Sequence, residues 1–385
     1  MKSYKHLFTR AFAAAPSRLH LAAHSHHLWP DASRDAQLAA WDDAAALADR
    51  KWAKVFGEIL PQAQANVARE LNLPSPDTVV FAPNTHELIV RLFSALSMRP
   101  VRILTSDCEF HSFARQSARW AEAGLATLEI VPTEPFADFE TRFLEAAATG
   151  AHDLVFVSHL FFKTGRAFAR AFELARIAKP EGPWVVIDGY HAFMALPTDL
   201  AAVSERIFYV GGGYKYAMTG EGAAFLHAPP GYGARPVVTG WYAAFGALET
   251  GARGVAYAND ARRFLGATFD PSALYRLNAV CALLRREGLA TGDIAKRAQA
   301  LRAMLHEAVA AGKCGALRDA EVLNADAPAR FTAFRHPRAG EWKAALDAAD
   351  VIVDCRDDVL RIGFGLYHDP ADIERFCALA ARALR

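Results

Sequence analysis

The chain contains little cysteine, and its few cysteines form no recognisable motif. No two of them make a CxxC pair, and none shows the spacing of zinc ligands. A sparse, odd-numbered set is typical of a reducing compartment, so we expect a cytoplasmic location. In a chain of 385 residues the five cysteines are Cys108, Cys281, Cys314, Cys355 and Cys377.

Long hydrophobic runs and an excess of one charge are also missing. No apolar run is long enough to cross a bilayer, and the basic start MKSYKHLFTRAFAAAP is interrupted by Arg10 and too short for a secretory signal. The formal net charge is +1, and Lys and Arg are scattered along the chain. Nucleic acids and membrane surfaces are therefore not expected partners. Because 52% of the residues are apolar, the chain can bury a full core and offer sites to small molecules.

Short apolar, β-rich runs alternate with helical stretches between about residues 75 and 230. Two of the intervening stretches, HELIVRLFSAL and FADFETRFLEAA, have apolar residues at the spacing of amphipathic helices. This alternation predicts an α/β fold with a mainly parallel central sheet covered by helices on both faces. The predicted strands are DTVVF, VRILTS, ATLEIV, DLVFVS, WVVID, RIFYVG and AAFLH.

The flanking regions differ from this block. Residues 31–71 are rich in Ala and helical in pattern, and Pro61 is placed for the first turn of a helix. Residues 271–311 are also helical in pattern, and a smaller α+β unit follows them. Its predicted strands are FTAFR, VIVDC and VLRIGFG, and its last helix is ADIERFCALAARAL.

These patterns predict three parts that pack tightly, since no Ser- or Gly-rich linker separates them. Residues 1–40 form an N-terminal segment that packs with the small domain. Residues 41–265 form the large α/β domain, and residues 266–385 form the small C-terminal domain.

Polar residues follow several of the predicted strands. Asp188 ends WVVID, Lys215 follows RIFYVG, and Asn84 and Thr85 follow DTVVF at a helix start. Ligands of open α/β sheets gather at the carboxyl ends of the strands, so these side chains should share one site.

An acid and a lysine in this order suit the pyridine ring and aldehyde of pyridoxal 5'-phosphate (PLP). The Asp188 carboxylate would keep the ring nitrogen protonated, and the Lys215 amine would form the imine. The helix start at Asn84 or Thr85 would receive the phosphate. The small residues of GGGYKY would let the backbone approach the cofactor closely.

Each of these features also has an ordinary explanation. A lysine after a glycine run is usually a solvated loop residue, an Asp at a strand end usually forms a turn or cap, and an Asn-Thr pair usually caps a helix. Only their occurrence together, in this order, favours a PLP site.

The sequence also resembles the class V, fold-type I PLP enzymes, and among them the kynureninases. The likeness covers about residues 20 to 380 and is strongest in VIDGYHAF, GGGYKYAMTGEG, the GW of TGWYAAFG, and DCRDDVLRIGFGLYHDPADIERF. It implies Lys215, Asp188 and His191 as catalytic residues, although His191 could instead be a hydrogen-bonded core residue. The other implied cofactor contacts are Thr85, His86, Tyr214 and Trp241 at the phosphate, Phe110 stacked over the ring and Ser158 beside it; Tyr214 and Trp241 could also be plain core aromatics.

On the substrate side, Arg361 falls where the family places the arginine that binds the α-carboxylate. A planar guanidinium makes paired, charge-assisted bonds to a carboxylate, which Lys cannot reproduce. The alternative is an arginine on the exposed face of an edge strand.

Three departures from the kynureninase pattern leave the substrate open. AAHSHHLWP replaces the family's Asn-Ser-Leu-Gly-like segment, and its His24, His26 and His27 could bind a metal. Because no second cluster with ligand spacing accompanies them, we expect no metal and place His26 and His27 at the substrate mouth. His111 replaces the proline that follows the stacked aromatic residue, and GATFDPSAL lacks the Asn that recognises an aryl group.

The resemblance implies kynureninase-like hydrolytic Cβ–Cγ cleavage of a small amino acid, with Lys215 removing the α-proton. It also implies a homodimer whose active sites take residues from both chains. A class V aminotransferase, an epimerase, a cysteine desulfurase or another lyase would use the same scaffold. A desulfurase needs a nucleophilic cysteine, and the only candidate, Cys355, lies in an apolar β-like run where thiols are usually inert.

Overall fold

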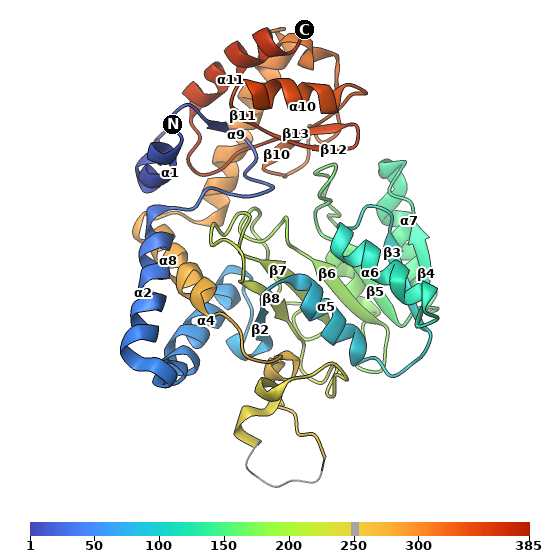
Figure 1. The fold of residues 1–385 in the computed structure, drawn as a ribbon. Helices are drawn as coiled ribbons and strands as arrows, with labels where there is room; N and C mark the ends of the chain where they lie inside the picture. The colour runs from blue at the N-terminus through green and yellow to red at the C-terminus, as the bar shows by residue number, and fades with distance from the viewer. Residues whose placement is uncertain (248–253) are drawn as a thin grey trace.

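The computed structural model describes residues 1–247 and 254–385. A seven-stranded sheet forms the centre of its larger part (Figure 1). The strand order is β2-β8-β7-β6-β5-β3-β4; β8 is antiparallel to both of its neighbours, and the other neighbouring pairs are parallel. All seven predicted strands are confirmed as members of this sheet. Their bounds are β2 Val79–Ala82, β3 Val101–Ser106, β4 Ala126–Val131, β5 Leu154–Ser158, β6 Trp184–Asp188, β7 Ile207–Gly212 and β8 Ala224–His227.

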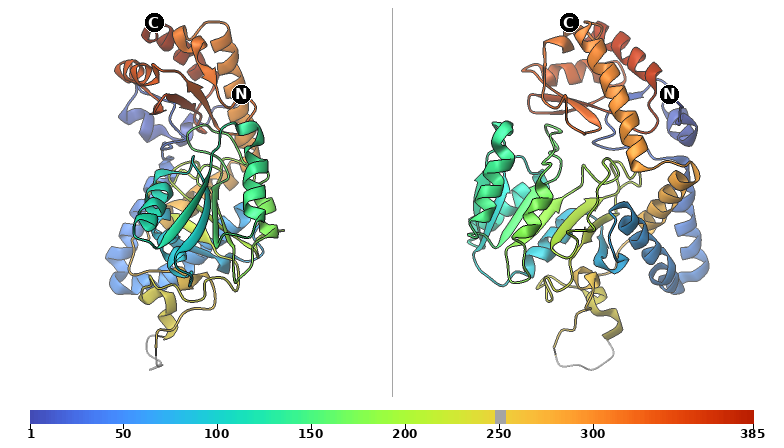
Figure 2. Two further views of the ribbon diagram at one scale, coloured as in Figure 1. Left: turned by 90° about the vertical axis from the view of Figure 1, so that its right-hand side faces the viewer. Right: turned by 180° about the vertical axis from the view of Figure 1, so that it is seen from behind.

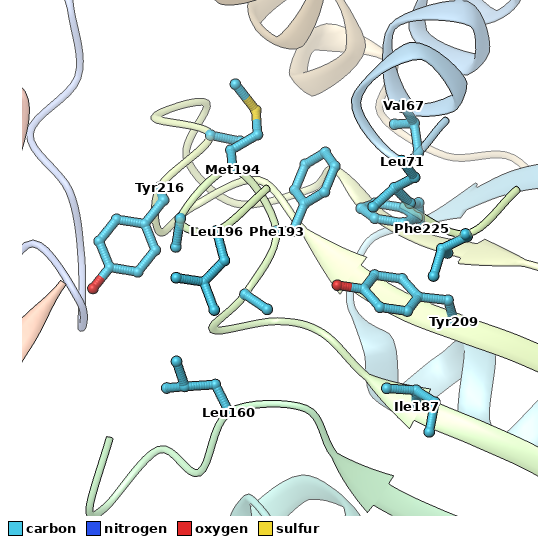
Figure 3. Close-up of a cluster of buried hydrophobic side chains, with 14 of the residues drawn as sticks. Val67, Leu71, Leu160, Ile187, Phe193, Met194, Leu196, Tyr209, Tyr216 and Phe225 are labelled. Atoms are coloured by element: carbon cyan, nitrogen blue, oxygen red, sulfur yellow. The ribbon is translucent and has the colours of Figure 1, made fainter. Parts of the chain in front are cut away.

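The central strands are apolar throughout because both faces of the sheet are covered. Successive residues point to opposite faces, so Val155 and Val157 join one hydrophobic core while Leu154 and Phe156 join another. Figure 3 shows part of the first core, in which side chains of neighbouring strands meet those of a helix. The predicted α/β fold with a mainly parallel, helix-covered sheet is therefore confirmed.

Helices pack on both sides of this sheet (Figure 2). The connecting helices are α5 Thr85–Ser94, α6 His111–Glu122 and α7 Phe136–Ala148. The flanking helices are α2 Asp31–Leu47, α3 Lys51–Lys54, α4 Leu60–Glu70 and α8 Ser272–Arg286, of which α8 contacts α2 and α4.

The predicted helical stretch 31–71 contains an irregular turn. A π-helical turn, η3 (Val55–Ile59), separates α3 from α4 and ends two residues before Pro61. Proline has no N–H to donate and its ring crowds the preceding turn, so a wider turn accommodates it within an otherwise continuous helix.

A smaller antiparallel sheet lies beside the C-terminal helices, in the order β12-β13-β10-β9. Its strands are β9 Glu321–Val322, β10 Phe331–Arg335, β12 Asp354–Arg356 and β13 Val359–Gly363. Its helices are α9 Thr291–Ala310, α10 Ala339–Ala348 and α11 Pro370–Ala383. The predicted α+β character of this part is confirmed.

The N-terminal segment joins this smaller part. β1 (Leu19–His20) pairs in parallel with β11 (Val351–Ile352), and Ala22 forms a bridge with Gly363. The run VIVDC, predicted as one strand, is therefore divided between two sheets, because β11 pairs with β1 whereas β12 pairs with β13.

The remaining short elements connect these parts. They are α1 Thr9–Ala14 and the 3-10 turns η1 Lys5–Leu7, η2 Ala48–Arg50, η4 Pro76–Thr78, η5 Ala171–Arg176, η6 Trp241–Ala247, η7 Ala261–Phe264 and η8 Gly315–Asp319. The domain boundaries at residues 40 and 265 stay predictions, and α2 runs across the first of them. Among the described residues, no helix combines the length and apolarity needed to span a bilayer.

Candidate active site

A cavity of about 200 Å³ opens where β2, β5 and β6 end and the segment after β7 begins. Residues far apart in the sequence meet there because parallel strands end at the same edge of a sheet. The cavity brings together eight of the predicted site residues: Thr85, His86, Phe110, Ser158, Asp188, His191, Tyr214 and Lys215.

Lys215 is held among aromatic rings and is only 4% exposed. Its Nζ lies 4.3 Å from the centre of the Tyr190 ring and 5.3 Å from that of Phe110, and it donates to the Tyr214 hydroxyl at 3.1 Å. Burial lowers the pKa of Lys215 to about 7, although the Asp188 carboxylate opposes this shift. A large fraction of this amine is therefore uncharged at neutral pH and available as a nucleophile or base.

Asp188 ends β6 and is buried. Its Oδ1 accepts a hydrogen bond from the Tyr190 N–H at 2.8 Å, and no bond is made to Oδ2 by the described residues. Burial raises the pKa of Asp188, and the nearby Lys215 opposes that shift. One carboxylate oxygen is therefore free for a ring N–H.

The start of α5 suits an anion. Asn84 caps the helix by accepting from the Glu87 N–H at 3.0 Å, as the sequence predicted. Thr85 and His86 occupy the first turn and line the cavity. First-turn N–H groups have no partner within the helix and lie at the positive end of its dipole, so they suit a phosphate.

His191 and Ser158 complete this side of the cavity. Burial lowers the pKa of His191 well below its usual value, so the ring is neutral, and its Nδ1 has no hydrogen-bond partner among the described residues. Ser158 donates through its hydroxyl to Glu109 at 2.6 Å and through its N–H at 3.2 Å.

These groups fit PLP. The free oxygen of Asp188 suits the protonated ring nitrogen, the amine of Lys215 suits the aldehyde, and the start of α5 suits the phosphate. Phe110 and His191, whose Nδ1 has no partner among the described residues, line the same cavity.

Sequence reasoning missed Glu109. It follows β3 and is buried, and it also accepts from the Ser106 hydroxyl. Burial raises the pKa of Glu109 to about 8, and the charge of Asp188 acts in the same direction. The only available signal was a carboxylate soon after the end of the predicted strand VRILTS. Tyr190, Phe162 and Glu221 are among the other cavity residues that were missed.

The glycines of GGGYKY also make room for protein side chains. A Cβ on Gly212 would collide with the Tyr190 side chain, and one on Gly213 would collide with the Thr219 hydroxyl group. The expectation that these glycines let the backbone approach the cofactor stays a prediction.

Arg361 lies in β13, is 2% exposed and is not among the residues that line the cavity. β13 is paired on both sides, so the alternative of an exposed edge-strand arginine is wrong. Its guanidinium donates to the carbonyl oxygen of Phe162, which lines the cavity, and forms an ion pair with Asp354. Its Nε has no partner among the described residues.

The three histidines near the N-terminus diverge. His24 is fully buried and stacks on Phe331 with ring centres 4.7 Å apart. His26 is exposed and stacks on Tyr214 at 5.0 Å, at the rim of the cavity. His27 is buried, and its ring nitrogens bond to the Leu28 carbonyl oxygen at 2.7 Å and the Leu366 N–H at 3.3 Å. Thus only His26 lies beside the cavity mouth.

Trp241 does not reach the cavity of its own chain. It is 43% exposed and stacks on Tyr242, with ring centres 4.2 Å apart. Over the part of the chain that the structure describes, no three His, Cys, Asp or Glu residues are grouped to hold a metal ion.

Comparisons with known proteins agree with this geometry. The family model described as aminotransferase class V matches residues 37–376. A stretch of 178 residues is 32% identical to the isopenicillin N epimerase of Streptomyces clavuligerus, covering 45% of this chain and 44% of that protein. The match thus spans less than half of that relative.

Several solved structures share the fold. The cystine C–S lyase C-DES, in complex with its reaction product cysteine persulfide, has a TM-score of 0.82 and 19% identity, covering 97% of this chain and 100% of that one. The cysteine desulfurase CsdA of Escherichia coli has a TM-score of 0.78 and 16% identity, with 99% and 97% covered. The apo cysteine desulfurase of Thermococcus onnurineus NA1 has a TM-score of 0.79 and 17% identity, with 99% and 98% covered.

The family match extends over most of the chain, whereas the predicted kynureninase-like branch within the family stays a prediction. The chain therefore belongs to the class V aminotransferase family and is a PLP-dependent enzyme.

Proposed function

We propose that the protein is a lyase that acts on a small α-amino acid and releases a group from its β-carbon. The observation that carries the proposal is a buried Lys215 of lowered pKa in one cavity with Asp188, beside a free helix start. When bound, PLP supplies an electron sink for the charge left at the α-carbon.

The chain's own residues divide the work. Lys215 holds or moves a proton at the α-carbon, because its amine is uncharged near neutral pH. Asp188 keeps a negative charge at the ring nitrogen, and the first turn of α5 holds the phosphate. Arg361 orients the substrate through its α-carboxylate. Phe162 and Leu160, which line the cavity, keep water away from it.

The size of the cavity supports a small substrate. Ligand pockets commonly measure roughly 300–1,000 Å³, and this one measures about 200 Å³. A cofactor would fill much of that space, so the substrate side chain must be short.

The position of Cys355 argues against a desulfurase that uses its own thiol. Cys355 packs against the core of the small sheet, while its neighbours in β12, Asp354 and Arg356, point to the other face, toward Arg361. Burial raises the pKa of the Cys355 thiol, which makes it a poor nucleophile. Direct elimination needs no such thiol, and C-DES, which is named a C–S lyase, shares this fold.

Kynureninase-like hydrolysis is the second candidate. The motifs VIDGYHAF and GGGYKYAMTGEG favour it, because they carry the likeness to that branch. The small cavity and the missing aryl-recognising Asn weigh against an aryl substrate.

We also propose the predicted homodimer with shared active sites. Trp241 supports it, since this aromatic side chain is exposed and outside the cavity of its own chain, and two further apolar residues, Val237 and Phe245, are exposed near it. The five cysteines are free, which supports the predicted cytoplasmic location. Size-exclusion chromatography with light scattering on the holoenzyme gives its molar mass and so tests the dimer.

Product analysis separates the two candidate reactions. The holoenzyme is given L-cysteine, β-chloro-L-alanine and L-kynurenine in turn. Elimination removes the α-proton and the β-substituent and yields pyruvate and ammonia, whereas hydrolytic Cβ–Cγ cleavage of kynurenine yields alanine and anthranilate. We expect pyruvate from the first two compounds; alanine and anthranilate alone would replace the lyase proposal by the second candidate.

A further inference from the structure

Asp354 is shared by two arginines beside the cavity. The pairing of β12 with β13 places Asp354 opposite Arg361, and these side chains form an ion pair. Arg356 lies two residues further along β12, on the same face, and its Nε is 3.4 Å from the same Asp354 oxygen. Two guanidinium groups therefore converge on one carboxylate.

The cluster carries more positive than negative charge. His24 Nε2 lies 3.9 Å from the shared oxygen, but burial lowers the pKa of His24 far below its usual value, so this ring adds no charge. Two arginine cations and one carboxylate remain. The next acidic residues along the chain, Asp357 and Asp358, pair with Lys163.

This excess charge matters because Arg361 already forms an ion pair with Asp354. An isolated Arg361–Asp354 pair would be neutral and would attract an incoming carboxylate weakly. Arg356 draws on the same carboxylate and restores one net positive charge at a place where Arg361 is 2% exposed and Asp354 is 14% exposed. The charge of Arg356 also reaches the cavity, where it contributes to lowering the pKa of Lys215 and of His191.

We propose that Arg356 is a positioning residue that sets the preference for α-carboxylates: by sharing Asp354, it leaves one net positive charge at Arg361 and its partners toward the substrate. The proposal rests on the proposed function, in which Arg361 binds the α-carboxylate. In this role Arg356 does not itself contact the substrate, because it supplies charge and not a pair of aligned donors.

L-Alanine and L-alaninamide provide the probe, because they differ only in the carboxylate. Each is titrated into the holoenzyme while the absorption of the bound cofactor is followed. Arg356→Gln should weaken the binding of L-alanine roughly fivefold to tenfold, which is the effect of one unit charge acting across about 10 Å in partly buried surroundings. The binding of L-alaninamide should stay unchanged. Arg356→Lys should restore the affinity for L-alanine to within about twofold of the wild-type value, since it restores the charge.

Arg335→Gln is the matched control. Arg335 lies in β10 of the same sheet, its side chain is 35% exposed against 38% for Arg356, and it pairs with Glu321 at 3.3 Å. Unlike Arg356, it is not among the charges that act on Lys215 or His191 in the cavity, so the same change of charge should alter neither titration.

Three outcomes would overturn the role of Arg356. They are equal weakening of the binding of both ligands by Arg356→Gln, no change in the binding of either ligand, and failure of Arg356→Lys to restore the binding of L-alanine. If Arg361→Lys weakens L-alanine while Arg356→Gln does not, only this inference fails. If neither ligand perturbs the wild-type cofactor, or Arg361→Lys has no effect, the proposed function fails first and this inference falls with it.

Discussion

The two sides of the cavity treat their charged groups differently. On the side of the larger sheet, Lys215, Asp188 and His191 are buried and make few bonds to the described residues. The amine of Lys215, one oxygen of Asp188 and the Nδ1 of His191 therefore keep bonding capacity for a ligand. On the side of the smaller sheet, Arg361 and Arg356 are already paired with Asp354.

This difference separates chemistry from recognition. Buried groups with unused bonding capacity have shifted pKa values and are ready for a ligand that completes them. Arg361 is paired and stays charged at neutral pH, since burial lowers its pKa only to about 10, and its fixed geometry suits the recognition of a carboxylate. Changes on the first side should therefore abolish reaction, and changes on the second should alter affinity.

Replacing the lysine should have the largest effect. Lys215→Ala should lower product formation at least 10²-fold to 10⁴-fold, the usual contribution of a positioned acid–base group. The control is Lys163→Ala, since Lys163 pairs with Asp357 at 2.8 Å outside the cavity. Equal activity of the two variants in a product assay would remove the distinction between the two sides.

Replacing the arginine should mainly change affinity. Arg361→Lys keeps the charge but loses one of two charge-assisted bonds, which is worth about 1.5–3 kcal/mol, so KM should rise roughly tenfold to hundredfold. The value of kcat should fall much less. A fall in kcat without a rise in KM, in steady-state kinetics on the same substrate, would contradict the division.

The pH dependence of cofactor attachment probes the first side directly. Since burial lowers the pKa of Lys215 to about 7, the uncharged amine predominates above that pH. Attachment of PLP to the apo-protein, followed by absorption, should slow about tenfold per pH unit below 7 and level off above it. N-acetyl-lysine is the control; a rate that keeps rising toward pH 10, as it does for this control, would show an ordinary lysine.

Glu109 offers a smaller effect, on stability. Burial raises the pKa of Glu109 to about 8, so the folded protein keeps a proton that the unfolded chain releases above its ordinary pKa. Stability is therefore lost as pH rises from the ordinary carboxyl range to about 8. Glu109→Gln, which has no such proton, should gain on wild type by on the order of 1 kcal/mol per pH unit across that window. Parallel curves for the free energy of unfolding in urea would contradict this.

The sequence predicted the first side well, for a physical reason. Most of the seven strands are short apolar runs covered on both faces, and all but the antiparallel β8 have their carboxyl ends at one edge of the sheet. Asp188, Lys215 and Thr85 could therefore be placed together from the ends of the predicted strands.

The second side depends on contacts that no local pattern encodes. Asp354 meets Arg361 through the register of β12 and β13, and the division of VIVDC depends on pairing with the distant β1. Glu109 accepts a hydrogen bond from Ser158, 49 residues later. His27 is next to His26 in the sequence, but its ring accepts a hydrogen bond from the Leu366 N–H and does not line the cavity.

The most direct test of the central claim is chemical. The holoenzyme is reduced with borohydride and digested, and the peptides that carry a pyridoxyl group are identified by mass spectrometry. We predict one modified lysine, Lys215, in the peptide that contains GGGYKY. A pyridoxyl group on any other lysine, with Lys215 unmodified, would contradict the assignment of this cavity as the active site.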